Sequence, residues 1–364
     1  MPGPVMLCYG TRPQVIKASV LRRALDHQTV MAVDTGQHYD YALNALLYEQ
    51  LGVELPDLTL EVGSAGHAEQ TAAIMQRSEP VMLEYRPALV LVIGDTNSTL
   101  GSALAAAKLR IPVAHVEAGL RATDALMAEE INRRVVDSLA HLLFTPSATA
   151  TELLMRSRPD ATVVQSGDVA FDVLRGQEDR LPASADVFAD ALPGAYAFAT
   201  LHRAELTDRP ELFLRVLDAL DRLPFPVILA LHPRTRKVLD EVAPDRSWRG
   251  ALRLHPAIGY RESLALCRDA RLVLTDSGGV QREAYWLGTP CITLRAETEW
   301  GETVEEGANA VLDPATNLDG IAALAEEQVR RGEEGWNRNC YGDGTAARAV
   351  AAAVDDFLAR EPGD

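Results

Sequence analysis

Acidic residues follow several apolar segments in the first half of the chain. Asp95 comes two residues after the aliphatic run 88–93, and Glu117 comes directly after the run 113–116. Glu129 and Glu130 open the next amphipathic segment. Carboxylates held close together push their pKa values apart, which leaves one acid and one base. The spacing predicts a proton-transfer site, with an ordinary ion pair between Glu129 and Arg133 on a presumed helix as the alternative.

The segment GTRPQVIK, residues 10–17, places two cations near one turn. Arg12 lies in the turn, Pro13 suits the first turn of a helix, and Lys17 lies about one turn further on. Two cations beside the free N–H groups of a helix start are suited to a diphosphate. The alternative is a capped turn with solvated charges.

A second anion site is indicated by DSGGVQ, residues 276–281. Ser277, Gly278 and Gly279 follow an apolar run, and glycines allow phosphate oxygens to approach the backbone closely. No lysine follows at the spacing of a P-loop. Glu283, about one turn into the expected helix, would lie within reach of ribose hydroxyls. An ordinary glycine-rich turn and an exposed acid are the alternatives.

Two histidines stand after apolar runs in the second half. His202 begins HRAE and His232 begins HPRT. An imidazole near neutral pKa can donate or accept a proton, whereas a structural role in a loop is the alternative. His38, after Thr35-Gly36-Gln37, is a further candidate with less support.

The elements that must position these residues alternate between short apolar runs and longer amphipathic ones. Strands that are apolar on both faces and alternate with helices predict parallel sheets covered on both sides, an α/β class. Such sheets bind ligands at the carboxyl ends of their strands. Two segments share the layout strand, polar turn, helix, strand: residues 89–117 and 272–297. The expected strands are 5–9, 30–35, 88–93, 113–116, 195–200, 227–230, 252–254, 272–275 and 291–294, and the expected helices include 14–25, 41–51, 98–109 and 345–358.

Length and composition set the broad class. The 364 residues predict about two domains, which we divide into residues 1–170 and 171–344, with a variable stretch at 176–194. The net charge of −17 argues against nucleic acid and anionic membrane partners. No apolar run is long enough for a membrane span, and no signal peptide is evident. The four cysteines lack metal-site spacing and are expected to be free thiols in the cytoplasm, with no metal bound.

Taken together, these motifs resemble the family of non-hydrolysing UDP-N-acetylglucosamine 2-epimerases. The sequences of these motifs are especially similar to those of the branch of UDP-2,3-diacetamido-2,3-dideoxyglucuronate 2-epimerases. The matching segments, in order, are GTRPQVIK, TGQHYD, GDTNSTL, HVEAGLRA, EEINRR, LHRAE, HPRT and TDSGGVQREA.

The resemblance implies two facing Rossmann-like domains with a cleft between them, as in B-type glycosyltransferases. Residues 1–170 would carry the catalytic carboxylates, the helix 345–364 would pack back on them, and residues 171–344 would bind UDP. The substrate would be a UDP-linked 2-acetamido sugar, the assembly a homodimer, and no cofactor would be needed. The residues implied as catalytic are Asp95, Glu117, Glu129 and His202, and those implied for substrate binding are Arg12, Lys17, Arg133, His232, Ser277, Gly278, Gly279 and Glu283.

The implied reaction interconverts UDP-N-acetylglucosamine and UDP-N-acetylmannosamine by eliminating UDP and adding it back. Epimerisation of the diacetamido uronate and a hydrolysing reaction that releases the manno sugar and UDP are the alternatives within this chemistry. A glycosyltransferase of the same fold and a non-catalytic sugar-nucleotide sensor are rivals outside it.

Overall fold

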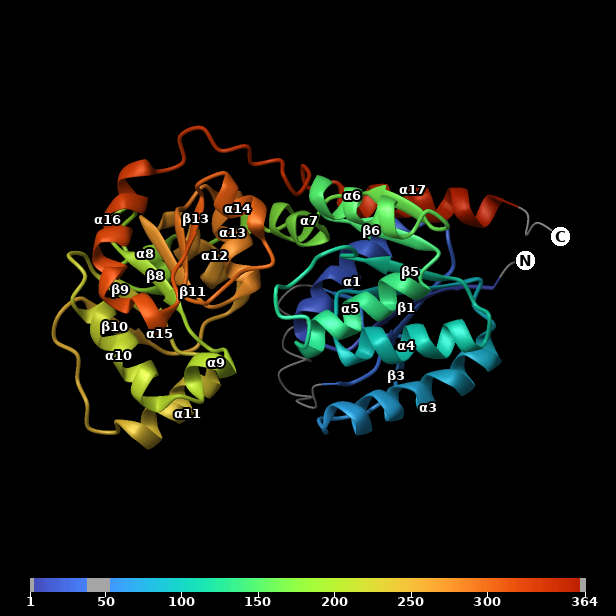
Figure 1. Cartoon of the computed structure of the whole chain (residues 1–364), viewed down its shortest axis with the longest axis horizontal. Helices are drawn as coiled ribbons and strands as arrows, with labels where there is room; N and C mark the ends of the chain where they lie inside the picture. Colours follow the sequence, from blue (N-terminus) through green and yellow to red (C-terminus); the bar gives the residue numbers. More distant parts are fainter. Residues whose placement is uncertain (1–2, 38–52, 361–364) are drawn as a thin grey trace. The chain divides into compact units, whose positions relative to one another are not determined.

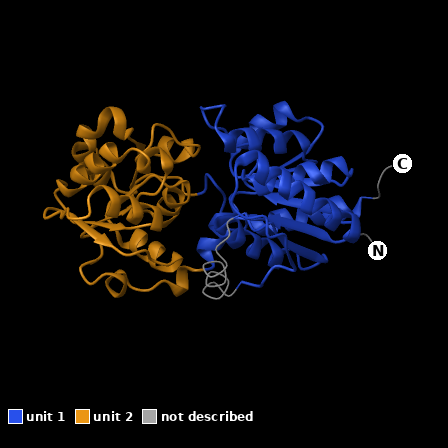
Figure 2. Cartoon of the chain, turned by 90° about the horizontal axis from the view of Figure 1, so that it is seen from below, with its two compact units in different colours: residues 1–176, 339–364 blue, residues 177–338 orange. Residues whose placement is uncertain are grey.

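The computed structural model describes residues 3–37 and 53–360 (Figure 1). The helix expected at 41–51 and the candidate His38 lie outside these residues. The chain divides into two compact units (Figure 2). Unit 1 comprises residues 1–176 and 339–364, and unit 2 comprises residues 177–338.

Unit 1 is built on a seven-stranded sheet in the order β3-β2-β1-β4-β5-β6-β7, and its paired strands are parallel. Apolar side chains of α1, α7 and α17 cover one face, and those of α4, α5 and α6, with α3 beside α4, cover the other. The strands are β1 (Val5–Tyr9), β2 (Val30–Asp34), β3 (Leu58–Thr59), β4 (Leu89–Ile93), β5 (Val113–Val116), β6 (Leu142–Thr145) and β7 (Thr162–Gln165). The helices are α1 (Arg12–Ala24), α3 (His67–Tyr85), α4 (Asn97–Lys108), α5 (Ala128–Leu139), α6 (Ala148–Ser157), α7 (Val169–Arg175) and α17 (Ala346–Ala359).

Unit 2 repeats this topology with six parallel strands in the order β10-β9-β8-β11-β12-β13. Helices α10 and α16 bury apolar side chains on one face, and α12 and α13 do so on the other. The strands are β8 (Ala197–Thr200), β9 (Val227–Ala230), β10 (Leu252–His255), β11 (Leu272–Thr275), β12 (Cys291–Thr293) and β13 (Asn309–Val311). The helices are α8 (Ser184–Val187), α9 (Ala204–Thr207), α10 (Pro210–Asp221), α11 (Pro233–Val242), α12 (Tyr260–Asp269), α13 (Gly278–Leu287), α14 (Gly301–Glu305), α15 (Pro314–Asn317) and α16 (Ile321–Arg331).

The expected α/β class with two parallel sheets is confirmed. Both sheets have the strand order of the Rossmann fold. In this order the second and third strands lie on one side of the first strand, and the fourth and later strands lie on its other side. The two segments of shared layout become β4–α4–β5 and β11–α13–β12, which occupy the same place in each sheet. Their loops therefore lie at the carboxyl ends of central strands, where ligands bind in open parallel sheets.

The chain leaves unit 1 after Gly176 and returns at Asn339, so residues 171–176 and 339–344 belong to unit 1 rather than to the second part. The reason is helix α7, which packs against α1 and α17. The Asp172 carboxylate accepts hydrogen bonds from the first two N–H groups of α17, at 2.9 and 2.8 Å. In addition, the N–H of Asp168 donates to the carbonyl of Tyr341 at 2.9 Å. These bonds fasten both crossing segments to unit 1.

Within residues 3–37 and 53–360, no helix is both long and apolar enough to cross a membrane.

Candidate active site

The turn between β1 and α1 is fixed by the side chain of Gln14. Its carbonyl oxygen accepts from the N–H of Gly10 at 3.0 Å, and its amide donates to the carbonyl of Ile93 at 2.6 Å. Gly10 is required there, because a Cβ on it would lie 2.0 Å from Thr35 Oγ1 and 2.2 Å from Ser98 Oγ. The Gln14 side chain therefore ties the end of β1 to the end of β4, next to Asp95.

Asp95 stands just beyond β4 and is held at several points. Its Oδ2 lies 2.5 Å from Arg133 Nη2, and its backbone carbonyl accepts from Asn132 Nδ2 at 2.9 Å. Both partners lie on α5. The carboxylate is 32% exposed, whereas the Arg133 side chain is 4% exposed. A buried cation thus fixes an acid that still faces the outside of unit 1.

Glu117 stands just beyond β5, beside Asp95 in the sheet. Its Oε1 lies 2.5 Å from Lys17 Nζ, and both side chains are buried. Its Oε2 lies 3.2 Å from the point that a Cβ on Gly94 would occupy. Glu117 has a φ of +69°, a left-handed conformation that costs energy for a residue with a side chain. Lys17 therefore holds one oxygen of a strained glutamate while the other lies over the residue before Asp95.

The two glutamates at the start of α5 have different surroundings. Glu129 is exposed in the first turn. Glu130 is fully buried, and its carboxylate lies 2.5 Å from Arg133 Nη1 and 2.6 Å from Arg134 Nε. It also accepts from the N–H of Ala122 at 3.0 Å. Glu130 thus anchors the arginine that holds Asp95, and Glu129 is the one open to a ligand.

Arg12 is the first residue of α1 and is exposed. Unit 1 therefore brings together Asp95, Glu117, Lys17 and Arg133, with Arg12 and Glu129 at the starts of the neighbouring helices.

In unit 2, the glycine loop begins α13. Ser277 caps the helix, since its hydroxyl accepts from the N–H of Val280 at 3.4 Å. Gly278 and Gly279 are the first two helical residues. A Cβ on Gly279 would lie no closer than 3.8 Å to its nearest neighbour, the Ser277 hydroxyl. No heavy atom stands nearer than this to block the approach of an anion to the start of the helix, which the sequence predicts as an anion site.

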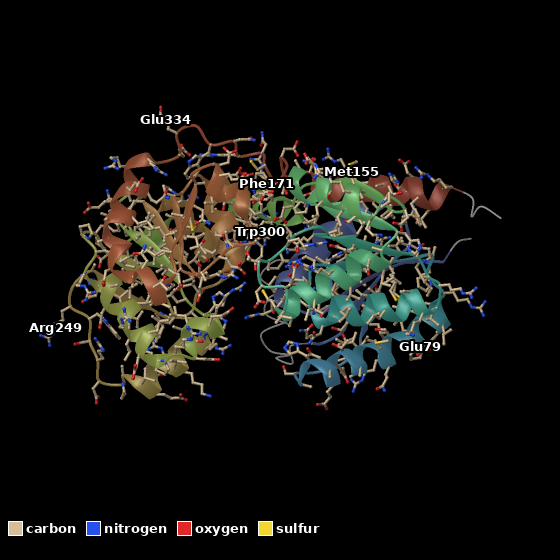
Figure 3. All side chains as sticks on the ribbon, viewed as in Figure 1. Glu79, Met155, Phe171, Arg249, Trp300 and Glu334 are labelled. Atoms are coloured by element: carbon tan, nitrogen blue, oxygen red, sulfur yellow. The ribbon has the colours of Figure 1, made fainter. Side chains whose placement is uncertain are left out.

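Nitrogen atoms of three side chains surround Gly278. The nearest atoms to a Cβ built there are Trp300 Nε1 at 3.4 Å, Arg203 Nη2 at 3.9 Å and Gln281 Nε2 at 3.9 Å. Trp300, labelled in Figure 3, lies directly before α14. The guanidinium of Arg282 lies over its ring, 3.8 Å from the centroid. These groups add donors and positive charge to the helix start.

Trp300 and Arg282 lie beside Gly278 but are not among the residues predicted from the sequence. Trp300 lies 22 residues from Gly278 in the sequence and reaches it only through the loop between β12 and α14. The run ETEW, residues 297–300, combines acidic and aromatic residues and was the available signal. Its spacing matches neither the periodicity of a helix nor that of a strand.

The two histidines of unit 2 lie side by side. The rings of His202 and His232 are 5.3 Å apart between centroids. His202 Nδ1 lies 3.6 Å from Asp276 Oδ1, and the Asp276 carboxylate accepts from the backbone N–H groups of His202 and Arg203 at 2.8 and 2.9 Å. Burial raises the pKa of Asp276, while the charge of His202 and these N–H bonds oppose the rise. Asp276 thus fixes the His202 loop beside α13.

Glu283 lies half-buried on the second turn of α13. Burial raises the pKa of the Cys267 thiol, and the Glu283 charge raises it further. Cys8, Cys267 and Cys291 are buried free thiols. Among the residues that the structure describes, no three His, Cys, Asp or Glu side chains gather in a way that could hold a metal ion.

Comparison with known proteins identifies the family. The sequence profile of the family described as UDP-N-acetylglucosamine 2-epimerase matches residues 22–355. The UDP-2,3-diacetamido-2,3-dideoxy-D-glucuronate 2-epimerase of Pseudomonas aeruginosa is 38% identical over 98% of this chain and 99% of that protein. The UDP-N-acetylglucosamine 2-epimerase of Methanocaldococcus jannaschii is 35% identical over 94% of this chain and 96% of that protein.

A crystal structure of the M. jannaschii UDP-GlcNAc 2-epimerase in complex with UDP-GlcNAc and UDP superposes with a TM-score of 0.86 at 34% identity, covering 98% of this chain and 100% of that one. The chain is therefore an enzyme of the UDP-N-acetylglucosamine 2-epimerase family, whose members are isomerases acting on UDP-sugars.

Proposed function

We propose that this enzyme interconverts UDP-N-acetylglucosamine and UDP-N-acetylmannosamine without hydrolysis. The observation that carries the proposal is the pair Asp95 and Glu117, which stand at the ends of adjacent strands and are each bonded to one buried cation. Inversion at C2 requires one group that removes the proton from one face of the sugar and another that delivers it to the opposite face. Two carboxylates on neighbouring loops meet this requirement.

The chemistry follows an elimination and its reversal. The C2 proton has no neighbouring carbonyl to acidify it, so its direct removal would be slow. When a base takes this proton while the C1–oxygen bond to the diphosphate breaks, the products are 2-acetamidoglucal and UDP. Adding UDP back at C1, with a proton delivered to the other face of C2, gives the epimer. Asp95, Glu117 and the exposed Glu129 are the acids that we assign to the hexose.

The groups of unit 2 are assigned to the nucleotide. The N–H groups of Gly278 and Gly279 and the hydroxyl of Ser277 would bind the diphosphate as it leaves C1. Arg203 and Trp300 surround Gly278 and would add donors to the same anion. His202 would exchange a proton with the departing phosphate, with His232 beside it, and Glu283 would bind the ribose.

The cations of unit 1 have mixed assignments. Arg12, exposed at the start of α1, is assigned to the diphosphate. Lys17 and Arg133 are bonded to Glu117 and Asp95, so any contact that they make with the substrate would be shared with these acids. They therefore orient the two carboxylates as well as shaping the pocket.

Incubation with UDP-N-acetylglucosamine in deuterated water, followed by proton NMR, tests this proposal. The C2 proton signal should disappear while the manno epimer accumulates and free UDP stays low. Steady release of UDP with free manno sugar would favour the hydrolysing reaction. Absence of exchange with any UDP-linked 2-acetamido sugar would overturn the epimerase proposal.

The diacetamido uronate is the second candidate substrate, favoured by the 38% identity to the P. aeruginosa enzyme. Its C6 carboxylate needs a cation in addition to those that hold the diphosphate. Of the described cations around the two acids, Lys17 and Arg133 are already bonded to carboxylates, an arrangement that suits the neutral hexose better. Exchange with the uronate and none with UDP-N-acetylglucosamine would select the second candidate.

We further propose that the enzyme is a cytoplasmic homodimer. Free cysteine thiols suit a reducing compartment, and the resemblance to the family implies the dimer. Light scattering coupled to size-exclusion chromatography measures the mass, and a value near 39.5 kDa would contradict the dimer.

A further inference from the structure

A histidine lies in the middle of the sheet of unit 1. His115 belongs to β5, where its register neighbours are Val92 on β4 and Leu143 on β6. It is fully buried. A buried imidazole must find hydrogen-bond partners for its ring nitrogens, because leaving them unpaired costs about 1–3 kcal/mol each. The partners of His115 therefore show what the residue holds.

Both ring nitrogens of His115 face groups that accept hydrogen bonds. Nε2 lies 2.8 Å from the carbonyl oxygen of Gly94, and Nδ1 lies 2.8 Å from Asp137 Oδ1. Burial would raise the pKa of Asp137, but the bonds and charges of His115 and Arg121 outweigh it and lower that pKa. A carbonyl and a carboxylate both accept hydrogen bonds, so the ring of His115 is held between two acceptors.

The pair of His115 and Asp137 is bonded to the loops that carry Asp95 and Glu117. On the β4 side, His115 holds the carbonyl of Gly94, whose N–H donates to the carbonyl of Val116 at 2.9 Å. The peptide unit directly before Asp95 is therefore fixed. On the β5 side, Asp137 Oδ2 accepts from the N–H of Gly119 at 3.2 Å.

The guanidinium of Arg121 donates to the same Asp137 oxygen at 2.7 Å. Both loops turn through left-handed backbone, with φ angles of +68° at Gly94, +69° at Glu117 and +84° at Gly119. Only Glu117 is strained by this conformation, and its glycine neighbours Gly94 and Gly119 are held by His115 and Asp137.

We propose that His115 is a positioning residue that sets the spacing of Asp95 and Glu117 for the two proton transfers at C2. This inference rests on the proposed function. His115 acts through the backbone: its ring contacts neither Asp95 nor Glu117, but it holds Gly94, over which Glu117 lies and which precedes Asp95. A displacement of about 1 Å in a reacting group can cost about 100-fold in rate.

Two conservative variants separate the two bonds of the ring. In His115→Gln the amide stands near the position of Nε2 and can still donate to Gly94. In His115→Asn it stands near Nδ1 and can donate only to Asp137. We expect kcat to fall by about 100-fold in His115→Asn and by about 10-fold in His115→Gln, with KM unchanged in both. A residue that served stability alone would not rank the variants in this order.

His255→Gln is the matched control. His255 also places both ring nitrogens against carbonyl oxygens, at 2.9 Å from Pro256 and 3.2 Å from Val187, and it lies at the end of β10 in unit 2. Its replacement should lower the melting temperature without changing kcat. Rates are divided by the concentration of folded sites, measured by UDP titration.

Equal kcat values per folded site in wild type and His115→Asn would overturn the inference, as would a loss that falls on KM. If His115→Asn does not fold, Asp137→Asn provides the test: the ring of His115 then lacks the carboxylate that holds Nδ1, and a wild-type kcat in this variant would overturn the inference. Failure of the proposed function itself would look different, because wild-type enzyme would then exchange no proton at C2.

Discussion

In unit 1, β4 is followed by Asp95, whose carboxylate is 32% exposed and bonded to an arginine side chain. In unit 2, the equivalent strand β11 is followed by Asp276, which is 1% exposed and accepts from two backbone N–H groups. The strand orders of the two sheets are the same. Asp95 is thus available to a ligand, whereas the Asp276 carboxylate is used to hold the backbone of the loop at His202 and Arg203.

The contrast extends to the other groups at the strand ends. Unit 1 gathers ionisable side chains in buried pairs, such as Lys17 with Glu117 and His115 with Asp137. Unit 2 gathers a helix start, two glycines and side-chain nitrogens around Gly278. We assign proton transfer to one unit and anion binding to the other although they share one topology, because the residues at the strand ends, and not the sheet, determine the chemistry.

The largest expected effect is the loss of a proton-transfer group. Asp95→Asn and Glu117→Gln should each lower kcat by about 10²–10⁴-fold and leave UDP affinity unchanged, because neither acid is among the groups assigned to UDP. The measurements are the rate of deuterium incorporation at C2 and UDP binding by calorimetry.

The control for Asp95→Asn is Asp218→Asn. Asp218 pairs with Arg246 at 2.5 Å and is 30% exposed, close to the 32% of Asp95, but its arginine is 40% exposed and it lies on α10 of unit 2. This variant should retain the wild-type rate. A wild-type rate in Asp95→Asn as well would remove the distinction between the two acids.

Breaking the buried pair of Lys17 and Glu117 in unit 1 should affect both stability and rate. Lys17→Met leaves Glu117 buried without its cation, and we expect the free energy of unfolding to fall by about 3–5 kcal/mol. Urea unfolding followed by far-UV circular dichroism measures this loss.

The double variant Lys17→Met with Glu117→Gln provides the contrast. It removes both charges and should recover most of the stability while remaining inactive. If the double variant is as unstable as Lys17→Met alone, the pair is not the source of the loss.

The anion site of unit 2 should respond through binding rather than rate. Trp300→Phe removes the indole N–H nearest to Gly278 but keeps a ring beneath Arg282. We expect KM for the UDP-sugar to rise about 10-fold with kcat unchanged, since a hydrogen bond to a charged group contributes about 1.5–3 kcal/mol.

Trp286→Phe is the matched control for this substitution. Trp286 lies on α13 and its ring is 5.8 Å from the same Arg282 guanidinium, but it is not among the atoms nearest Gly278. Its replacement should leave KM unchanged. Equal changes in the two variants would indicate that the Arg282 packing, and not the indole N–H, supports binding.

The sequence was sufficient to predict the architecture, because strands buried on both faces read as continuous apolar runs. The strands at 5–9, 113–116, 227–230 and 272–275 have the bounds that were expected. The edge strand β7 was missed because its ends, Thr162 and Gln165, are exposed polar residues that leave only two apolar residues between them.

Partnerships between distant residues could not be predicted in the same way. Lys17 and Glu117 are 100 residues apart, and no periodicity relates them. At the start of α5, four-residue spacing suggested a pair between Glu129 and Arg133. The helix instead turns Glu130, Arg133 and Asp137 inward, because these three share its buried face. Helical phase depends on the packing of the whole helix, which local spacing does not fix.

The smallest effects should appear in the dependence of stability on pH, and they should have opposite signs in the two units. The pKa of Asp137 is lowered in the folded state, so its stabilising contribution is present above the unfolded value of about 3.9 and is lost as pH falls through the folded pKa. The pKa of Asp276 is raised in the folded state, so its ionisation costs stability as pH rises above about 3.9.

The destabilisation caused by Asp137→Asn should therefore grow with pH, and that caused by Asp276→Asn should shrink with pH. All four tryptophans, at positions 248, 286, 300 and 336, lie in unit 2, so urea unfolding followed by tryptophan fluorescence reports on Asp276→Asn. Hydrogen exchange in peptides that span β4 and β5 reports on Asp137→Asn. If the destabilisation changed with pH in the same direction in both variants, the two aspartates would have the same kind of effect on stability. The contrast between the units would then rest on the exposed Asp95 alone.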